Sequence, residues 1–436
     1  MPEVQAVTNL SACCIQQFPP QTNLSTNFFD FNGASTGMSF LDLPPIIERM
    51  LLVSDKISDL NFSVGQQPQV EVNGKLTGVQ PLGLQKLSPY QTEVIAMSLM
   101  EGNPDAAQRL ANTGSVDLSY SLPAKIRFRV NIFQQRGTYS IVMRVIPTDI
   151  PTLASLDLPA QLSEITSLRN GIVLVTGPTG AGKTSTLAAL LDSINDQHHY
   201  HIVTIEDPIE FLHQHRRATI NQREIGTDTK DFPSALRAAL RQAPKIILIG
   251  EMRDYETTEI ALEAAETGHL VLSTLHTIDA SKTIDRIIGL YPKNEEQVIR
   301  TRLAQTFRYI LSQRLIPRAD NSGRIAALEI LKSTPRTREY LQNGESDGKT
   351  LLDAMRDGKY DGMQHFDGVI KEMIQNKTVT LEDGLAFATN QNNLMLELKG
   401  VSGKDDFFQA DAPSRPAAAA PTRTQRSPSM LDLVEK

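Results

Sequence analysis

The spacing of hydrophobic and polar residues divides the chain into two regions with different periods. In the first region, apolar residues between Leu41 and Val53 recur on one face of a helix. Four segments after it are predicted to be half-buried strands, because they alternate apolar and polar residues or contain a turn signal. They are 58–64, 70–75, 126–131 and 139–144. The pair Asn73-Gly74 predicts a hairpin turn. Residues 39–147 are therefore predicted to form a small α+β domain.

The second region follows a proline-containing segment, 148–152, which we interpret as a linker. Short and nearly all-apolar runs then recur at 171–175, 202–205, 246–249 and 270–273. Such runs are typical of parallel strands that are covered on both faces. The stretches 185–194 and 232–240 between them have a helical pattern. Residues 153–398 are therefore predicted to form an α/β domain with a parallel sheet and, from about residue 334, a helical appendage.

The two ends of the chain lack any sustained period. Residues 1–38 are rich in Asn, Gln, Thr, Ser and Pro, and residues 399–436 include a tract of Ala, Pro, Arg and Ser. Because such compositions do not bury a core, we expect a disordered extension and a disordered tail.

Composition and charge narrow the possible functions. The formal net charge is −7 and no long basic run occurs, which argues against a nucleic-acid partner. No apolar run reaches the roughly 18 to 20 residues that cross a bilayer, and the first residues do not resemble a signal peptide. The two cysteines, Cys13 and Cys14, are adjacent, which fits a reducing compartment. We expect a cytoplasmic protein that contacts membranes only through partners.

The strongest chemical motif is segment 177–184, which fits the pattern G-x-x-x-x-G-K-[ST] between a predicted strand and a predicted helix. Its backbone N–H groups and the start of the helix suit phosphate oxygens. Lys183 is expected to reach the β- and γ-phosphates of ATP, and the Thr184 hydroxyl to bind Mg²⁺. The predicted nucleotide-binding residues are Gly177, Pro178, Thr179, Gly180, Ala181, Gly182, Lys183, Thr184 and Ser185.

Acidic residues follow two of the apolar runs. Glu206 and Glu210 flank Asp207-Pro208 at the end of one run, and Glu251 follows Gly250 at the end of another. Acids at strand ends are often only caps or solvated groups. Beside a phosphate loop, however, they are candidates for binding Mg²⁺ and orienting the attacking water.

Two histidines bracket the run at 270–273. His269 precedes it and His276 follows it. Such histidines are usually satisfied by hydrogen bonds alone. Near this site they are instead candidates for sensing the γ-phosphate or for contacting a neighbouring subunit.

Four motifs in this order resemble the secretion and pilus motor ATPases: the phosphate loop, an aspartate box (204–210), a Gly-Glu motif (246–254) and a histidine box (266–277). Within the type II/IV secretion ATPase superfamily, the chain is most similar to the type IV pilus retraction, twitching-motility (PilT-like) ATPases. It has no room for the extra leading domain of the assembly type, and no cysteine after Cys14 for that type's four-cysteine zinc site.

The resemblance implies a RecA-like ATPase domain after a PAS-like domain, a homo-hexameric ring, and a cytoplasmic position beside an inner-membrane pilus platform protein. It places Glu251 beside Mg²⁺ and the attacking water, with Glu210 and then Glu206 as further candidates. Arg127 and Arg129 would approach the phosphates as arginine fingers, although a solvated strand face is the other interpretation. The function expected is an ATP-driven motor of pilus retraction. Pilus assembly, type II/IV secretion and nucleic-acid translocation remain alternatives.

Overall fold

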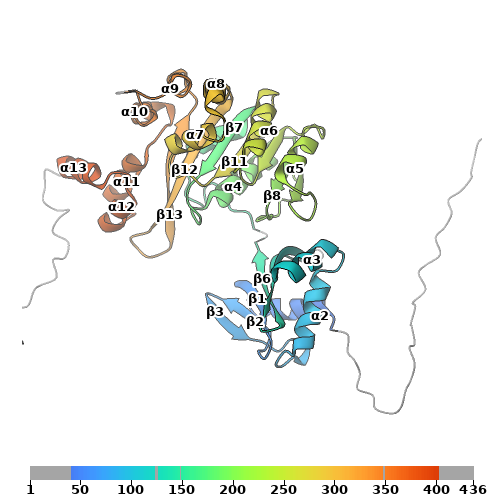
Figure 1. Ribbon diagram of the computed structural model, residues 1–436. Helices are drawn as coiled ribbons and strands as arrows, with labels where there is room; N and C mark the ends of the chain where they lie inside the picture. The colour runs from blue at the N-terminus through green and yellow to red at the C-terminus, as the bar shows by residue number, and fades with distance from the viewer. Residues whose placement is uncertain (1–40, 123–125, 148, 347–348, 402–436) are drawn as a thin grey trace, which may run out of the picture. The chain divides into compact units, whose positions relative to one another are not determined.

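The computed structural model describes residues 41–122, 126–147, 149–346 and 349–401 (Figure 1). The extension and the tail predicted at 1–38 and 399–436 lie outside these residues, except that residues 399–401 end the last helix. Residues 149–152 of the predicted linker contain neither helix nor strand.

Residues 41–147, here called the N-terminal region, form the predicted α+β structure. Six antiparallel strands form one sheet in the order β3-β2-β1-β6-β5-β4. The predicted hairpin is confirmed, since Val72 of β2 pairs with Lys75 of β3. Phe62 and Phe128 lie fully buried in the core. The elements are α1 (Leu43–Leu51), β1 (Ile57–Phe62), β2 (Gln69–Val72), β3 (Lys75–Gly78), η1 (Pro81–Gly83), α2 (Pro89–Leu99), α3 (Pro104–Thr113), β4 (Ser115–Leu122), β5 (Ile126–Gln135) and β6 (Thr138–Ile146).

The second sheet has seven strands in the order β13-β12-β7-β11-β10-β8-β9. The four predicted parallel strands, β7, β8, β10 and β11, are confirmed, and only the pair β12–β13 is antiparallel. Every residue of β7, β10 and β11 is buried, as their apolar runs require. The elements are η2 (Ala160–Ser167), β7 (Gly171–Thr176), α4 (Lys183–Gln197), β8 (His201–Glu206), β9 (Thr219–Glu224), α5 (Phe232–Ala239), β10 (Ile246–Ile249), α6 (Tyr255–Glu266), β11 (Leu270–Leu275), α7 (Ala280–Ile288), η3 (Lys293–Glu295), α8 (Glu296–Thr306), β12 (Phe307–Pro317) and β13 (Arg324–Lys332).

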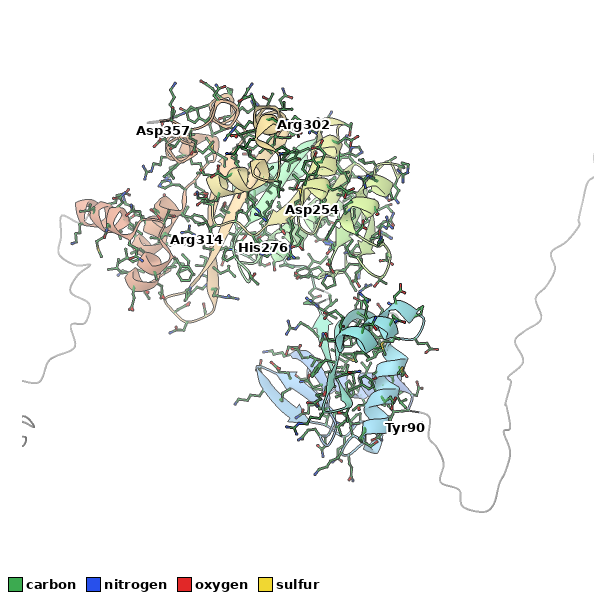
Figure 2. All side chains as sticks on the ribbon, in the orientation of Figure 1. Tyr90, Asp254, His276, Arg302, Arg314 and Asp357 are labelled. Atoms are coloured by element: carbon green, nitrogen blue, oxygen red, sulfur yellow. The ribbon has the colours of Figure 1, made fainter. Side chains whose placement is uncertain are left out.

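The predicted helical appendage is also confirmed. It comprises α9 (Pro335–Asn343), α10 (Leu351–Asp357), η4 (Gly358–Asp361), α11 (Phe366–Gln375), α12 (Leu381–Phe387) and α13 (Gln391–Val401). Figure 2 shows Arg314 of β12 beside these helices. Its guanidinium lies 3.7 Å from the centre of the Phe366 ring and donates to the Phe387 carbonyl at 2.6 Å. The appendage is thus tied to the sheet by both a cation–π contact and a charged hydrogen bond.

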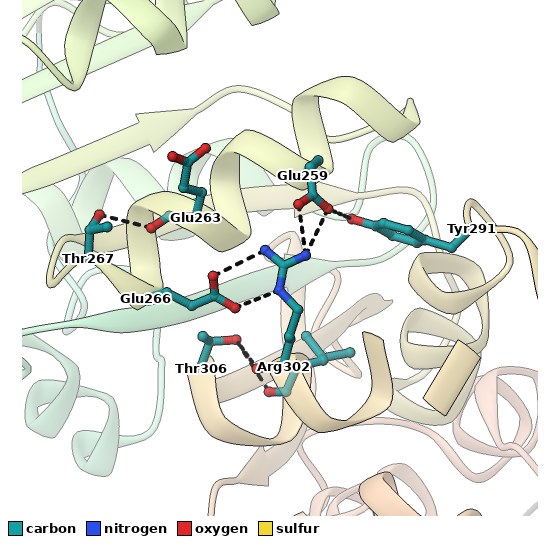
Figure 3. Close-up of polar contacts among 8 residues, drawn as sticks. Glu259, Glu263, Glu266, Thr267, Tyr291, Arg302 and Thr306 are labelled. Atoms are coloured by element: carbon teal, nitrogen blue, oxygen red, sulfur yellow. Dashed lines mark hydrogen bonds and ion pairs between the residues drawn. The ribbon is translucent and has the colours of Figure 1, made fainter. Parts of the chain in front are cut away.

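An ion-pair network joins α6 to α8 (Figure 3). Arg302 of α8 donates to both oxygens of Glu266, at 2.6 and 3.1 Å, and to both oxygens of Glu259, at 2.7 and 3.0 Å. The Tyr291 hydroxyl donates to Glu259 at 3.0 Å. Burial and this hydrogen bond raise the pKa of Tyr291 above its ordinary value, so Tyr291 keeps its proton and remains the donor.

None of the helices in the described ranges is both long enough and apolar enough to serve as a membrane span.

Candidate active site

The phosphate loop lies between the carboxyl end of β7 and the start of α4. Gly177 has a φ of 147° and Gly182 a φ of 85°, which L-residues with a side chain rarely adopt. A Cβ on Gly177 would lie 2.5 Å from the Gln313 carbonyl oxygen, so close backbone packing also requires glycine there. The loop therefore has the tight, inward-curled backbone that the sequence motif predicts.

Lys183 is buried against its own loop. Its Nζ donates to the carbonyl oxygens of Gly177 at 3.0 Å and Pro178 at 3.1 Å, and lies 3.4 Å from Nδ1 of His276. Burial lowers the pKa of Lys183, and the charges of Glu210 and Glu251 oppose that shift. The ammonium group is thus held where phosphate oxygens of a nucleotide would replace the two carbonyl groups as its partners.

Gln313 of β12 supports the loop from behind, a role that sequence reasoning did not find. Its side chain is buried and accepts a hydrogen bond from the Thr186 hydroxyl at 2.8 Å. Its Nε2 lies only 2.9 Å from where a Cβ on Gly182 would be. Because β12 also contains Arg308, Ser312 and Arg314, no local pattern distinguishes Gln313 as a site residue.

Glu251 lies at the centre of a polar chain at the carboxyl edge of the sheet. Its carboxylate pairs with Nε of Arg253 at 2.6 Å and lies 3.5 Å from Nε2 of His276. His276 therefore stands between Glu251 and Lys183, at the edge of the sheet where Figure 2 labels it. The structure thus brings together three of the predicted catalytic residues.

The other two predicted glutamates have different surroundings. Glu206 is buried and accepts hydrogen bonds from Thr204 at 2.7 Å and Gln222 at 3.1 Å. Burial raises its pKa, which makes it a poor carrier of negative charge. Glu210 is exposed and faces the same cavity. Asp207, which the sequence analysis did not single out, also faces it, and burial followed by the charge of Glu251 raises its pKa.

His269 does not join this cluster. It precedes β11 at the amino end of that strand, while His276 follows the carboxyl end, about 20 Å away at about 3.3 Å per residue. Its Nδ1 lies 2.9 Å from the Ala264 carbonyl oxygen at the end of α6. The expectation that His269 senses the γ-phosphate is therefore wrong within one chain, because strand direction separates it from the loop. A contact with a neighbouring subunit stays a prediction.

The two predicted arginine fingers differ in their partners. Arg127 donates to Glu224 at 2.9 Å, and that carboxylate also accepts the backbone N–H of Ile209 at 3.1 Å. Glu224, which is buried at the end of β9, was not predicted as a site residue. Arg129 is exposed and lines the cavity of the phosphate loop.

The cavity formed by these residues has a volume of about 640 Å³ and is lined by the loop residues 179–185 together with the acids. Among the residues that the structure describes, no three His, Cys, Asp or Glu side chains converge to hold a metal unaided. Mg²⁺ bound with nucleotide phosphates needs only one or two protein ligands. Thr184 and Glu251 both line the cavity and fit that requirement.

Comparison with known proteins identifies similar molecules. A family model described as type II/IV secretion system protein matches residues 72–383. The type IV pilus retraction ATPase PilT of Pseudomonas aeruginosa is 40% identical over 326 residues, which cover 75% of this chain and 92% of the relative. A twitching motility protein of Neisseria gonorrhoeae is 38% identical over 327 residues, covering 75% and 86%. A crystal structure of the pilus retraction motor PilT with bound ADP aligns with a TM-score of 0.73 at 36% identity, covering 82% of this chain and 99% of that one.

Proposed function

Because the chain belongs to the family of type II/IV secretion system proteins, we propose that it is an ATP-hydrolysing motor that powers type IV pilus retraction and hence twitching motility. The observation that carries the proposal is the convergence of Lys183, Glu251 and His276 beside a complete phosphate loop. The similarity to retraction proteins over most of their length supports retraction rather than assembly or secretion. The RecA-like fold agrees with the solved structure of a pilus retraction motor.

The substrate of this site is ATP. The loop residues 177–185 hold its phosphates, with Lys183 moving from the loop carbonyls to the β- and γ-phosphate oxygens. The Thr184 hydroxyl and Glu251 would hold Mg²⁺, which neutralises charge on the phosphates when it is bound.

Hydrolysis needs a water molecule placed in line with the γ-phosphorus. The water oxygen attacks phosphorus, the bond to the β–γ bridging oxygen breaks, and ADP and phosphate leave. Glu251 orients this water and accepts its proton, and Arg253 and His276 hold the carboxylate in place. Glu210 is the second candidate for this role, because it faces the cavity from the loop after β8. Glu206 is third, since Thr204 and Gln222 already engage it.

The mechanical step rests on the family resemblance. We propose that residues 39–147 and 153–398 act as two domains of a subunit in a homo-hexameric ring. Closure around ATP would bring Arg129 to the phosphates and transmit force to an inner-membrane platform protein. Membrane contact would come through that partner, on the cytoplasmic side.

The enzymatic part is tested with Glu251→Ala in the full-length chain. We expect the variant to bind ATP within about threefold of wild type, because Lys183, the loop and Thr184 still hold the phosphates and Mg²⁺. We expect it to hydrolyse ATP at least about 100-fold more slowly, because the attacking water loses the group that orients it and accepts its proton. Glu263→Ala, which removes an exposed carboxylate from α6, is the matched control and should keep normal turnover. Near-normal turnover by Glu251→Ala would show that another group activates the water.

A further inference from the structure

The segment that carries His276 joins the end of β11 to the start of α7 and covers residues 276–279. It places the imidazole between two groups of the site, 3.4 Å from Nζ of Lys183 and 3.5 Å from the carboxylate of Glu251. The His276 side chain is 42% exposed, so packing alone does not fix it. Its position therefore depends on what holds the backbone of the segment.

Two contacts attach this segment to buried side chains. The Thr277 hydroxyl lies 2.6 Å from the hydroxyl of Thr283, which is fully buried in α7 and donates to the Asp279 carbonyl at 2.7 Å. Because the Thr283 hydroxyl has a single proton, Thr277 is the donor in the first of these bonds. At the other end of the segment, the backbone N–H of Ala280 donates to Glu329 of β13 at 2.8 Å. Both ends of the segment are thus tied to the interior.

The same side chains connect the segment to the phosphate loop. Thr283 lies 3.5 Å from the hydroxyl of Thr176, the last residue of β7 before the loop. Thr176 donates to the Ser312 hydroxyl at 3.0 Å, and Ser312 is in turn hydrogen-bonded to Glu329. Inside the protein, four side chains thus link the loop to segment 276–279. We call them the polar clamp: Thr176, Thr283, Ser312 and Glu329.

The polar clamp lies in the interior, where most side chains are apolar. Thr176, Thr283 and Ser312 have no exposed surface, and Glu329 is 4% exposed. Burying a polar group costs free energy unless it is hydrogen-bonded, and a fully bonded buried network specifies one arrangement of its members. The polar clamp therefore holds the loop and segment 276–279 in one defined arrangement.

We propose that Thr283 and Glu329 are positioning residues for ATP hydrolysis, which hold segment 276–279 so that His276 stays between Lys183 and Glu251. Neither Thr283 nor Glu329 lines the cavity of the phosphate loop, so each acts through His276. This inference rests on the proposed function and deepens it, since it names residues behind the site on which the reaction depends.

The test is steady-state ATP hydrolysis by the full-length chain with Mg²⁺, with kcat and KM determined separately and ADP affinity measured by isothermal titration calorimetry. Thr283→Val keeps the shape of the side chain and removes the hydroxyl. Its kcat should fall at least about tenfold, because a displaced His276 no longer holds Glu251 in place. Its KM and ADP affinity should stay within about threefold of wild type, because Lys183 and the loop are unchanged. Thr283→Ser, which keeps the hydroxyl, should retain kcat within about threefold.

Three comparisons separate positioning from a general structural effect. Glu329→Leu should lose kcat as Thr283→Val does, whereas Glu329→Gln, which still accepts from Ala280, should keep it. Thr306→Val is the matched control, since Thr306 is also a buried helical threonine whose hydroxyl donates to the carbonyl four residues before it, but it precedes β12 at the amino end of that strand. It should keep normal kcat. In a His276→Ala background, Thr283→Val should lower kcat by less than about twofold further, because the residue through which it acts is gone.

A wild-type kcat in Thr283→Val, or an equal loss in Thr283→Ser, would overturn the inference. The full further loss in the His276→Ala background would overturn it as well, because Thr283 would then act independently of His276. If Glu329→Leu does not fold, the Thr283 variants decide alone. Failure of the wild-type protein to hydrolyse ATP would instead refute the proposed function.

Discussion

Replacement of Arg302 by alanine should destabilise the contact between α6 and α8 without reaching the active site. The change removes four hydrogen bonds and leaves Glu259 and Glu266 without their cation. The three side chains are 23%, 34% and 33% exposed, so solvent screens the pairs only in part. A charge-assisted hydrogen bond contributes about 1.5 to 3 kcal/mol when buried, and an exposed ion pair about 0.2 to 1. Taking about 1.5 kcal/mol for each ion pair gives a loss of about 3 kcal/mol in the free energy of unfolding.

Thermal unfolding of the nucleotide-free protein measures this loss. A domain of this size loses about 2 to 4 °C in Tm for each kcal/mol, so Arg302→Ala should melt about 6 to 12 °C below wild type. Arg302→Lys should recover less than half of the loss, because an ammonium group cannot bridge both carboxylates. Adding Glu259→Gln to Arg302→Ala should restore part of the Tm by removing one unpaired charge. A Tm within 1 °C of wild type for Arg302→Ala would refute the reasoning, and would mean that the network contributes no net stability.

Three further predictions concern Gln313 of β12, Gly182 of the phosphate loop and Glu329 of β13. Gln313→Ala should leave the Thr186 hydroxyl without its partner, which costs about 2 kcal/mol and lowers Tm by about 4 to 8 °C. It should also weaken ADP binding several-fold. Calorimetry that finds both Tm and ADP affinity unchanged would contradict the role of Gln313 in supporting the loop. Gly182→Ala should weaken ADP binding more than tenfold at nearly unchanged fold, because its φ of 85° and the nearby Gln313 side chain both oppose a Cβ; wild-type affinity would contradict this. Burial raises the pKa of Glu329 to about 7 from 4.5, so the free energy of unfolding of wild type should fall as the pH rises from about 4.5 to 7. Glu329→Gln still accepts the hydrogen bond from Ala280 and does not lose stability over this range, so urea titrations should find it more stable than wild type by about 3 kcal/mol above pH 7. A stability difference that does not change with pH would show that Glu329 titrates normally.

Most strands of the second sheet can be predicted from the sequence because both of their faces are buried. β7, β10 and β11 have helices or other strands on all sides, so their apolar runs are continuous and easy to recognise. β9 lies at the edge of the sheet and reads Thr-Ile-Asn-Gln-Arg-Glu, in which no period stands out. The sequence analysis therefore predicts neither β9 nor the two site residues that it carries, Gln222 and Glu224.

The phosphate loop is predictable residue by residue because its backbone conformation and its lysine are local. Its surroundings are not. Gln313 reaches Thr186 across a distance of 127 residues in sequence, through the pairing of β12 with β7. No local pattern specifies such a partner. The position of His269, in contrast, could have been predicted from the sequence. Ligands of a parallel sheet lie at the carboxyl ends of its strands, and His269 precedes β11 and so lies at the amino end of that strand. Strand direction alone would have separated His269 from His276.

The most direct test of the retraction function counts surface fibres on cells of the native host that lack this gene, complemented with wild type or with Lys183→Ala. Lys183→Ala should abolish tight ATP binding, because no other cation replaces it in the loop. A retraction motor predicts more or longer fibres and lost surface motility in the deletion strain, with both restored by wild type and neither by Lys183→Ala. Cells without fibres would instead indicate assembly, and unchanged fibres with normal motility would contradict a pilus function.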